Sequence, residues 1–217
     1  NVSELKAAAR AYHASITVYL LGLMFLAGKA ATDHLHGEAS IQVPVNMRQY
    51  YPSKTLRNFS MYCGIRLPIE ETTDLQAIIV KIGEQLEKKT SKESMSAMLM
   101  STVRLVNIMM SIPLFLKQPV AKMVYGFLGD KIFTNTLSNL GVVEMTPAMA
   151  EHIESMDSLT GQPISNRASC SVVTINDTVT FTILKATLDP TFEETMYELL
   201  FADNIGIEVE GSDFYEA

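Results

Sequence analysis

The chain of 217 residues has few cysteines, no run of cationic residues and no apolar stretch long enough to cross a membrane. Cys63 and Cys170 lie in apolar, strand-like patterns, which predicts buried, reduced thiols of a cytoplasmic protein and argues against a cysteine nucleophile. The net charge of −7 without a basic run argues against a nucleic-acid partner. The apolar run from Val18 to Ala27 is about half of the roughly twenty residues that a membrane-spanning helix needs, so we expect a buried helix.

The composition is that of a folded globular protein. Apolar residues make up 47% of the chain and charged residues 19%. The length suits one large domain or two small subdomains, and we expect a single domain over residues 1–217. The chain begins with Asn1, inside a helical pattern and without the features of a secretory signal. We therefore expect a truncated or proteolytic piece of a longer protein.

Two strands joined by a cationic loop form the most informative segment, Ile41 to Pro68. Apolar and polar residues alternate over residues 41–46 and again over 59–65, which is the period of a half-buried strand. Pro44 lacks a backbone donor, which places the first strand at an edge or a bulge. The loop carries three cations, Arg48, Lys54 and Arg57. Such cations can bind phosphate oxygens, although a plain solvated loop is the alternative.

Helical patterns lie on both sides of this segment. We expect a first helix capped by Ser3, a second capped by Ser15 or Thr17, and a third capped by Thr72 or Thr73. A methionine-rich helical stretch from Met95 to Met123 follows, with breaks at Pro113 and Pro119. Its apolar face suits core packing or, alternatively, the wall of a pocket for an alkyl chain.

The C-terminal part alternates between strand and helix patterns. Residues 133–144 read as a strand, residues 156–159 as a short strand, and residues 169–186 as a hairpin about Asn176 and Asp177. Thr191 and Glu194 form a capping box for a last helix, which precedes a short strand at residues 205–209. Together, these strand and helix patterns predict an α/β (α+β) two-layer sandwich, with a mixed sheet packed against helices.

Three motifs in this sequence resemble the superfamily of condensation domains and chloramphenicol-acetyltransferase-like proteins. They are Val43-Pro44-Val45-Asn46-x-Arg48, the pair Arg57-Asn58-Phe59 and Leu67-Pro68, and TLSNLGVV from Thr136 to Val143. The resemblance is nearest to bacterial alcohol-acetyltransferase-like proteins and implies the C-terminal half of a two-lobed fold. The superfamily's catalytic His-His-x-x-x-Asp-Gly motif belongs to the N-terminal half, and no segment here matches it.

The resemblance also implies site residues. Ser138 and Asn139 become candidates for stabilising the oxyanion of acyl transfer or for lining the acyl tunnel. The alternative is that they satisfy backbone atoms where Gly141 bends the strand. Thr136, Arg48, Lys54 and Arg57 become candidates for binding substrate or coenzyme A. Acetyl-CoA or another acyl-CoA is the implied co-substrate, with no tightly bound cofactor and no metal.

Four histidines could in principle serve as the missing base: His13, His34, His36 and His152. His34 and His36 lie beside Asp33, an arrangement that could share a metal ion. The surrounding stretch is a polar linker without a convincing third ligand, so we favour a solvated loop. We expect none of the four to replace the missing catalytic histidine.

Three hypotheses for function remain. The first is half of an acyltransferase that moves an acyl group from a coenzyme A or carrier thioester to an alcohol or amine. The second is a non-catalytic docking module for a carrier protein or another partner. The third is a structural half that must join the missing N-terminal half. We expect the isolated chain to be inert and possible homo-oligomers to form through the face that the missing half would cover.

Overall fold

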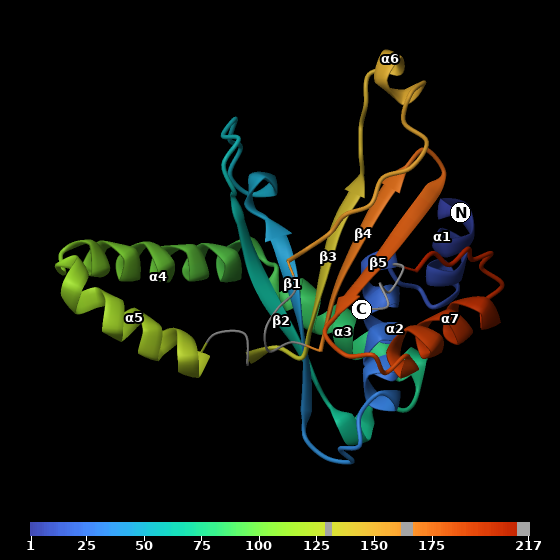
Figure 1. Ribbon diagram of the computed structural model, residues 1–217, viewed down its shortest axis with the longest axis horizontal. Coiled ribbons are helices and arrows are strands. Elements are labelled where there is room, and N and C mark those ends of the chain that lie inside the picture. The colour runs from blue at the N-terminus through green and yellow to red at the C-terminus, as the bar shows by residue number, and fades with distance from the viewer. Residues whose placement is uncertain (129–131, 162–166, 212–217) are drawn as a thin grey trace, which may run out of the picture.

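The computed structural model describes residues 1–128, 132–161 and 167–211. Within these ranges one mixed sheet has the strand order β2-β1-β3-β4-β5 (Figure 1). The strands are β1 (Glu38–Asn46), β2 (Ser60–Pro68), β3 (Asn135–Val142), β4 (Ala168–Ile175) and β5 (Thr178–Lys185). The outer pairs β2–β1 and β4–β5 are antiparallel, whereas β1, β3 and β4 run parallel. The predicted mixed sheet and α/β class are confirmed.

Helices cover one face of this sheet (Figure 1). They are α1 (Val2–Ala11), α2 (Ile16–Ala30), α3 (Leu75–Lys89) and α7 (Thr191–Ala202). Helix α2 is central, because it contacts α1, α3, α7 and β1, and its side chains Tyr19, Leu21 and Met24 are completely buried. Ser15 caps it as predicted, since its Oγ accepts the N–H of Val18 at 3.3 Å.

Among the described residues, no single helix has the length and apolar character needed to cross a membrane. Helices α1 and α2 meet those criteria only as a pair, and they are bent by 76° at the break between them.

Pro44 lies in an interior strand and at no register shift with β2, in contrast to the predicted edge or bulge. Strand β1 is hydrogen-bonded to β2 along its whole length, but it pairs with β3 only at Ile41 and Gln42. Beyond Gln42 the two parallel strands diverge (Figure 1). Pro44 therefore lies where β1 has no partner on its β3 side, which satisfies the constraint that proline imposes.

Two further helices extend away from the sheet (Figure 1). They are α4 (Lys92–Met110) and α5 (Leu114–Leu128), and together we call them the arm. The predicted break at Pro113 is confirmed, but the second helix begins at Leu114 and contains Pro119, so the predicted break at Pro119 was wrong. The carbonyl of Pro113 accepts the N–H groups of Leu116 and Lys117, both at 3.1 Å, and so starts the helix before Pro119.

Several predicted helix starts and short strands differ in the structure. Helix α1 is capped by Asn1, and α3 by Asp74, whose Oδ2 accepts the N–H of Ala77 at 2.8 Å. Thr191 and Glu194 form no capping box, because Asp189 Oδ1 accepts the N–H of Thr191 instead. Residues 156–159 and 205–209 are irregular, so the two short strands predicted there were wrong. The turn helix α6 (Pro147–Ala150) follows β3.

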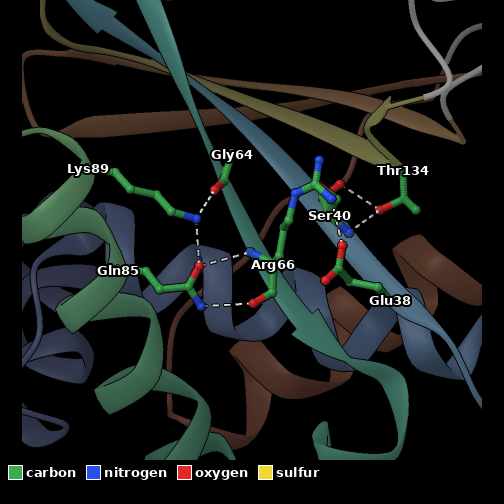
Figure 2. A network of polar contacts seen from close by, with 7 residues as sticks. All are labelled: Glu38, Ser40, Gly64, Arg66, Gln85, Lys89 and Thr134. Carbon is green, nitrogen blue, oxygen red and sulfur yellow. Dashed lines mark hydrogen bonds and ion pairs between the residues drawn. The ribbon is translucent and has the colours of Figure 1, made fainter. Parts of the chain in front are cut away.

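Side chains of α3 protect the outer edge of the sheet (Figure 2). Gln85 accepts the N–H of Arg66 at 3.2 Å and donates to the carbonyl of Arg66 at 2.8 Å, as a neighbouring strand would. Lys89 Nζ donates to the carbonyl of Gly64 at 2.6 Å, and its desolvation lowers the pKa of Lys89. These contacts block the addition of another strand at β2.

Candidate functional site

The face of the sheet opposite the helices is rich in hydroxyl groups. Direct neighbours in the register are Gln42, Thr136 and Ser169 in one row, and Ser138 and Ser171 in the next. We call these five residues the hydroxyl face. Side chains alternate along a strand, so their neighbours Leu137 and Cys170 point to the other side and are fully buried beneath the helices.

The chain itself covers part of the hydroxyl face. Ser171 donates to the carbonyl of Ser158, and the hydroxyls of Ser169 and Thr160 lie 2.7 Å apart. Ser169 and Ser171 are consequently buried. The irregular segment that was predicted as a strand at residues 156–159 therefore serves as a cover over β4.

Over β3 the hydroxyl face is more open. Thr136 Oγ1 donates to Gln42 Oε1 at 3.4 Å. Ser138 is half-buried, and its hydroxyl has no hydrogen-bond partner among the residues that the structure describes. Ser138 thus presents a hydroxyl on β3 that is available to a ligand.

Asn139 lies on the opposite face of β3 from Ser138. Its Nδ2 donates to Thr17 Oγ1 on α2 at 3.0 Å, and its Oδ1 accepts the N–H of Gly141 at 2.8 Å. The β3–β4 register shifts between Asn139 and Val142, and Gly141 has a φ of +72° that favours glycine. The Asn139 amide thus fixes a bulge against α2, and the structure does not bring it together with Ser138.

The three predicted loop cations have different environments. Arg48 Nη2 donates to the carbonyls of Thr55 and Arg57 at 2.8 and 2.9 Å, so its guanidinium spans the loop and fixes it. Lys54 and Arg57 are exposed, and neither side chain forms a hydrogen bond or ion pair with the described residues. No hydrogen bond or ion pair within the described ranges joins this loop to Thr136 or Ser138.

The four histidines lie outside the strands that form the hydroxyl face. His13 follows α1, His34 and His36 precede β1, and His152 follows α6. None of these side chains hydrogen-bonds to the hydroxyl face in the described part of the chain. Within that same part, no three histidine, cysteine or acidic side chains are arranged to hold a metal ion.

The two thiols are buried and protonated at neutral pH. Burial raises the pKa of Cys63 to about 11, and it also raises the pKa of Cys170, which is completely buried. A thiol becomes a good nucleophile as its thiolate, so neither residue is poised for covalent chemistry.

Comparison with known proteins identifies the fold. The chain aligns with an epimerization domain of tyrocidine synthetase B (TM-score 0.56, 14% identity), covering 94% of this chain and 46% of that one. It aligns similarly with polyketide synthase associated protein 5 from Mycobacterium tuberculosis (TM-score 0.54, 11% identity), covering 92% and 47%. For the PapA2 acyl transferase the TM-score is 0.52 with 12% identity, covering 94% and 42%. The chain has the condensation-domain and chloramphenicol-acetyltransferase-like fold.

These likenesses confirm the superfamily resemblance at the level of the fold. The chain spans about half the length of the solved structures that it matches. No protein-family model matches the sequence, and no curated protein matches it.

Sequence reasoning missed the part of the hydroxyl face that lies outside β3. Gln42, Ser169 and Ser171 each occupy the polar positions of an alternating strand, which is a signal that the sequence contains. Their meeting depends on the parallel pairing of β1, β3 and β4, which periodicity does not specify.

Proposed function

We propose that this chain is the C-terminal half of an acyltransferase that moves an acyl group from a coenzyme A or carrier thioester to an alcohol or amine. The observation that carries the proposal is the fold, which the chain shares with about half of each larger protein, including an acyl transferase. The hydroxyl face and the exposed arm support it, because each offers a surface that a second half could complete.

Ser138 is the residue that we propose to stabilise the transition state. Attack on a thioester carbonyl forms a tetrahedral oxyanion, and a fixed hydroxyl donor aimed at it lowers the barrier. Ser138 lies on a strand whose neighbours on the same face are held by hydrogen bonds, so its position is well defined. The proton-accepting base is proposed to come from a His-His-x-x-x-Asp-Gly motif in the missing half.

Lys54 and Arg57 are the cations that we propose to contact the phosphates of coenzyme A or of a phosphopantetheine arm. Both are exposed, whereas Arg48 is already bound to loop carbonyls. Arg48 therefore becomes a residue that shapes the phosphate site instead of a direct ligand.

The test begins with the gene and ends with kinetics. The reading frame upstream of Asn1 is expected to encode His-His-x-x-x-Asp-Gly. The isolated chain is expected to form no ester from acetyl-CoA and an alcohol. In the two-lobed protein, Ser138→Ala is expected to lower kcat about a hundredfold with little change in KM for acetyl-CoA.

Ser3→Ala is the matched control, because Ser3 is an exposed serine on α1, on the helix-covered side of the sheet, and its hydroxyl donates to Asn1 Oδ1 at 2.7 Å. This variant should keep full activity. Ester formation by the isolated chain would contradict the proposed division of roles between the halves. Unchanged kcat in Ser138→Ala would remove Ser138 from the mechanism.

A docking module is the second candidate, and the exposed loop supports it. Leu56 is fully exposed between Lys54 and Arg57, so the loop between β1 and β2 presents an apolar side chain and two cations together. This combination suits an acidic partner such as a carrier protein. A degenerate upstream motif, together with carrier binding that Lys54→Glu and Arg57→Glu abolish, would favour this candidate over the enzyme.

A further inference from the structure

A cavity of about 450 Å³ lies on the helix-covered side of the sheet, opposite the hydroxyl face. One row of the sheet lines it, in which Ile41, Asn135, Ala168 and Lys185 are direct neighbours. The row lies where β1, β3 and β4 begin and β5 ends. The volume is within the range of small-molecule sites.

Small residues leave this space open between larger apolar ones. Gly28 on α2 and Ala168 on β4 face the cavity, and a methyl group added at Gly28 would come only within 3.7 Å of Asn135 Nδ2. Met24, Phe25 and Phe192 supply an apolar wall from α2 and α7. The site therefore suits a ligand with an apolar body.

Two cations of the cavity lining have no carboxylate partner in the described residues. Arg167 Nη1 donates to the carbonyl of Ala31 at 2.9 Å, which holds the guanidinium at the C-terminal end of α2, close in sequence to Lys29. Lys29 itself makes no ion pair within the described ranges. Both side chains line the cavity. They can therefore receive an anionic group.

The other charged side chains of the lining are each held by neighbouring groups. Glu38 pairs with Arg66 at 2.7 Å (Figure 2). Lys185 pairs with Glu193 and also donates to the backbone carbonyl of Asp189. The Asp189 carboxylate accepts the N–H and hydroxyl of Thr191 at 3.1 and 2.6 Å, which lowers the pKa of Asp189. Asp189 is thus one anion without an ion pair in the described residues, against the two unpaired cations Lys29 and Arg167, so the unpaired charge of the lining is net positive.

A buried amide adds a polar group to the apolar wall. Asn135 is 4% exposed, and its Oδ1 has no hydrogen-bond partner among the described residues. An unpaired buried polar atom costs free energy, so a strand position that faces the core would ordinarily carry an apolar side chain. A polar residue at this cavity is consistent with a ligand-binding role.

We propose that this cavity binds a small amphipathic carboxylate. Its carboxylate would lie at Lys29 and Arg167, and its apolar body would lie between α2 and Phe192. The site is separate from the proposed acyl-transfer site, because the sheet lies between the two. The proposal of ligand binding in this cavity could therefore be wrong without affecting the proposed acyltransferase function.

The experiment uses the whole chain with 13C-labelled methionine methyl groups. Met24 reports on the cavity, whereas Met100 and Met110 are exposed on the arm and report on nonspecific apolar binding. Octanoate is expected to shift the Met24 signal in a saturable way. Octanol has the apolar body without the anionic group, and inorganic phosphate has the anionic charge without the apolar body. Each is expected to bind at least ten times more weakly than octanoate.

Charge removal tests the role of the two cations. Lys29→Gln combined with Arg167→Gln is expected to weaken octanoate binding roughly tenfold for each cation removed. Lys6→Gln is the matched control, because Lys6 is exposed on α1 and does not line the cavity. Circular dichroism checks folding, and Lys29→Gln alone keeps the test possible if the double variant does not fold.

Three results would overturn the proposal. In the first, only the arm signals respond to octanoate. In the second, octanol or phosphate binds as tightly as octanoate. In the third, the charge variants bind octanoate as tightly as Lys6→Gln does.

Discussion

Gly64 shows how one residue determines packing on the open side of the sheet. A Cβ atom at this position would lie 2.6 Å from Cε1 of Phe133, so the aromatic ring occupies the place of the missing side chain. The same ring packs edge-on against Tyr62, with centroids 5.7 Å apart. Gly64 therefore allows the segment before β3 to pack against β2.

Gly64→Ala is expected to lower the free energy of unfolding by about 1–3 kcal/mol, because the added methyl group displaces the Phe133 ring. Gly83→Ala is the matched control, since no atom lies within 4 Å of a Cβ added at this position of α3. The control should raise stability by up to about 1 kcal/mol, because alanine favours the helix. Urea unfolding measures both effects.

Equal effects of the two substitutions would contradict this account of Gly64. A further check is the double variant with Phe133→Ala, in which the cost of Gly64→Ala should largely disappear. Such non-additivity is expected of residues in contact and not of distant, independent sites.

At the scale of single elements, the loop between β1 and β2 depends on Arg48. Besides the two loop carbonyls, its side chain reaches Asn46 Oδ1 at 3.5 Å and lies 6.0 Å from the centre of the Phe59 ring. The first part of the loop is anchored elsewhere, because Tyr51 and Ser96 share a hydrogen bond of 2.6 Å. Arg48 therefore fixes the part of the loop that presents Lys54 and Arg57.

Arg48→Gln is expected to release this part of the loop without unfolding the protein, because the core does not include it. Trypsin should then cleave after Lys54 and Arg57 several times faster than in the unaltered protein, while the melting temperature changes little. Lys29→Gln is the control for removal of a cation elsewhere and should leave the cleavage rate unchanged. A loop that resists trypsin equally in Arg48→Gln would show that Arg48 does not hold it.

The elements that the sequence predicted well are those with a strong local signal. The alternation around Ile41 and Phe59 predicted β1 and β2, and Ser15 predicted the start of α2. The start of α3 was missed because Asp74 competes with two nearby threonines, and Thr72 uses its hydroxyl on the carbonyl of Pro68. Local patterns do not decide between caps of similar strength.

The candidate site was less predictable than the fold, because it depends on pairing across distant strands. Adjacent strand residues face opposite sides, so Ser138 and Asn139 could have been separated from sequence alone. The hydrogen bonds of Arg48 to its own loop could not be predicted from the sequence, because they depend on the conformation of that loop. The cavity beside Asn135 likewise depends on a row that joins β1, β3, β4 and β5.

At the scale of the whole molecule, the arm leaves a large apolar surface exposed. Met95, near its start, is buried against the body, whereas large apolar side chains along the rest are exposed. They include Met100, Val103, Leu105, Ile108, Met110, Leu114 and Phe115. Helices with such surfaces gain stability mainly from a packing partner. In the proposed two-lobed protein, we expect the N-terminal half to supply this partner.

Without that partner, the isolated chain is expected to self-associate through the arm. Ile108→Asp together with Phe115→Asp should restore a monomer, because charges in an apolar contact must be desolvated. Val80→Asp is the matched control, since Val80 is an exposed apolar residue on α3, away from the arm. Light scattering over a range of concentrations measures the mass. A monomeric unaltered chain at high concentration, or an equal effect of Val80→Asp, would show that the arm is not the associating surface.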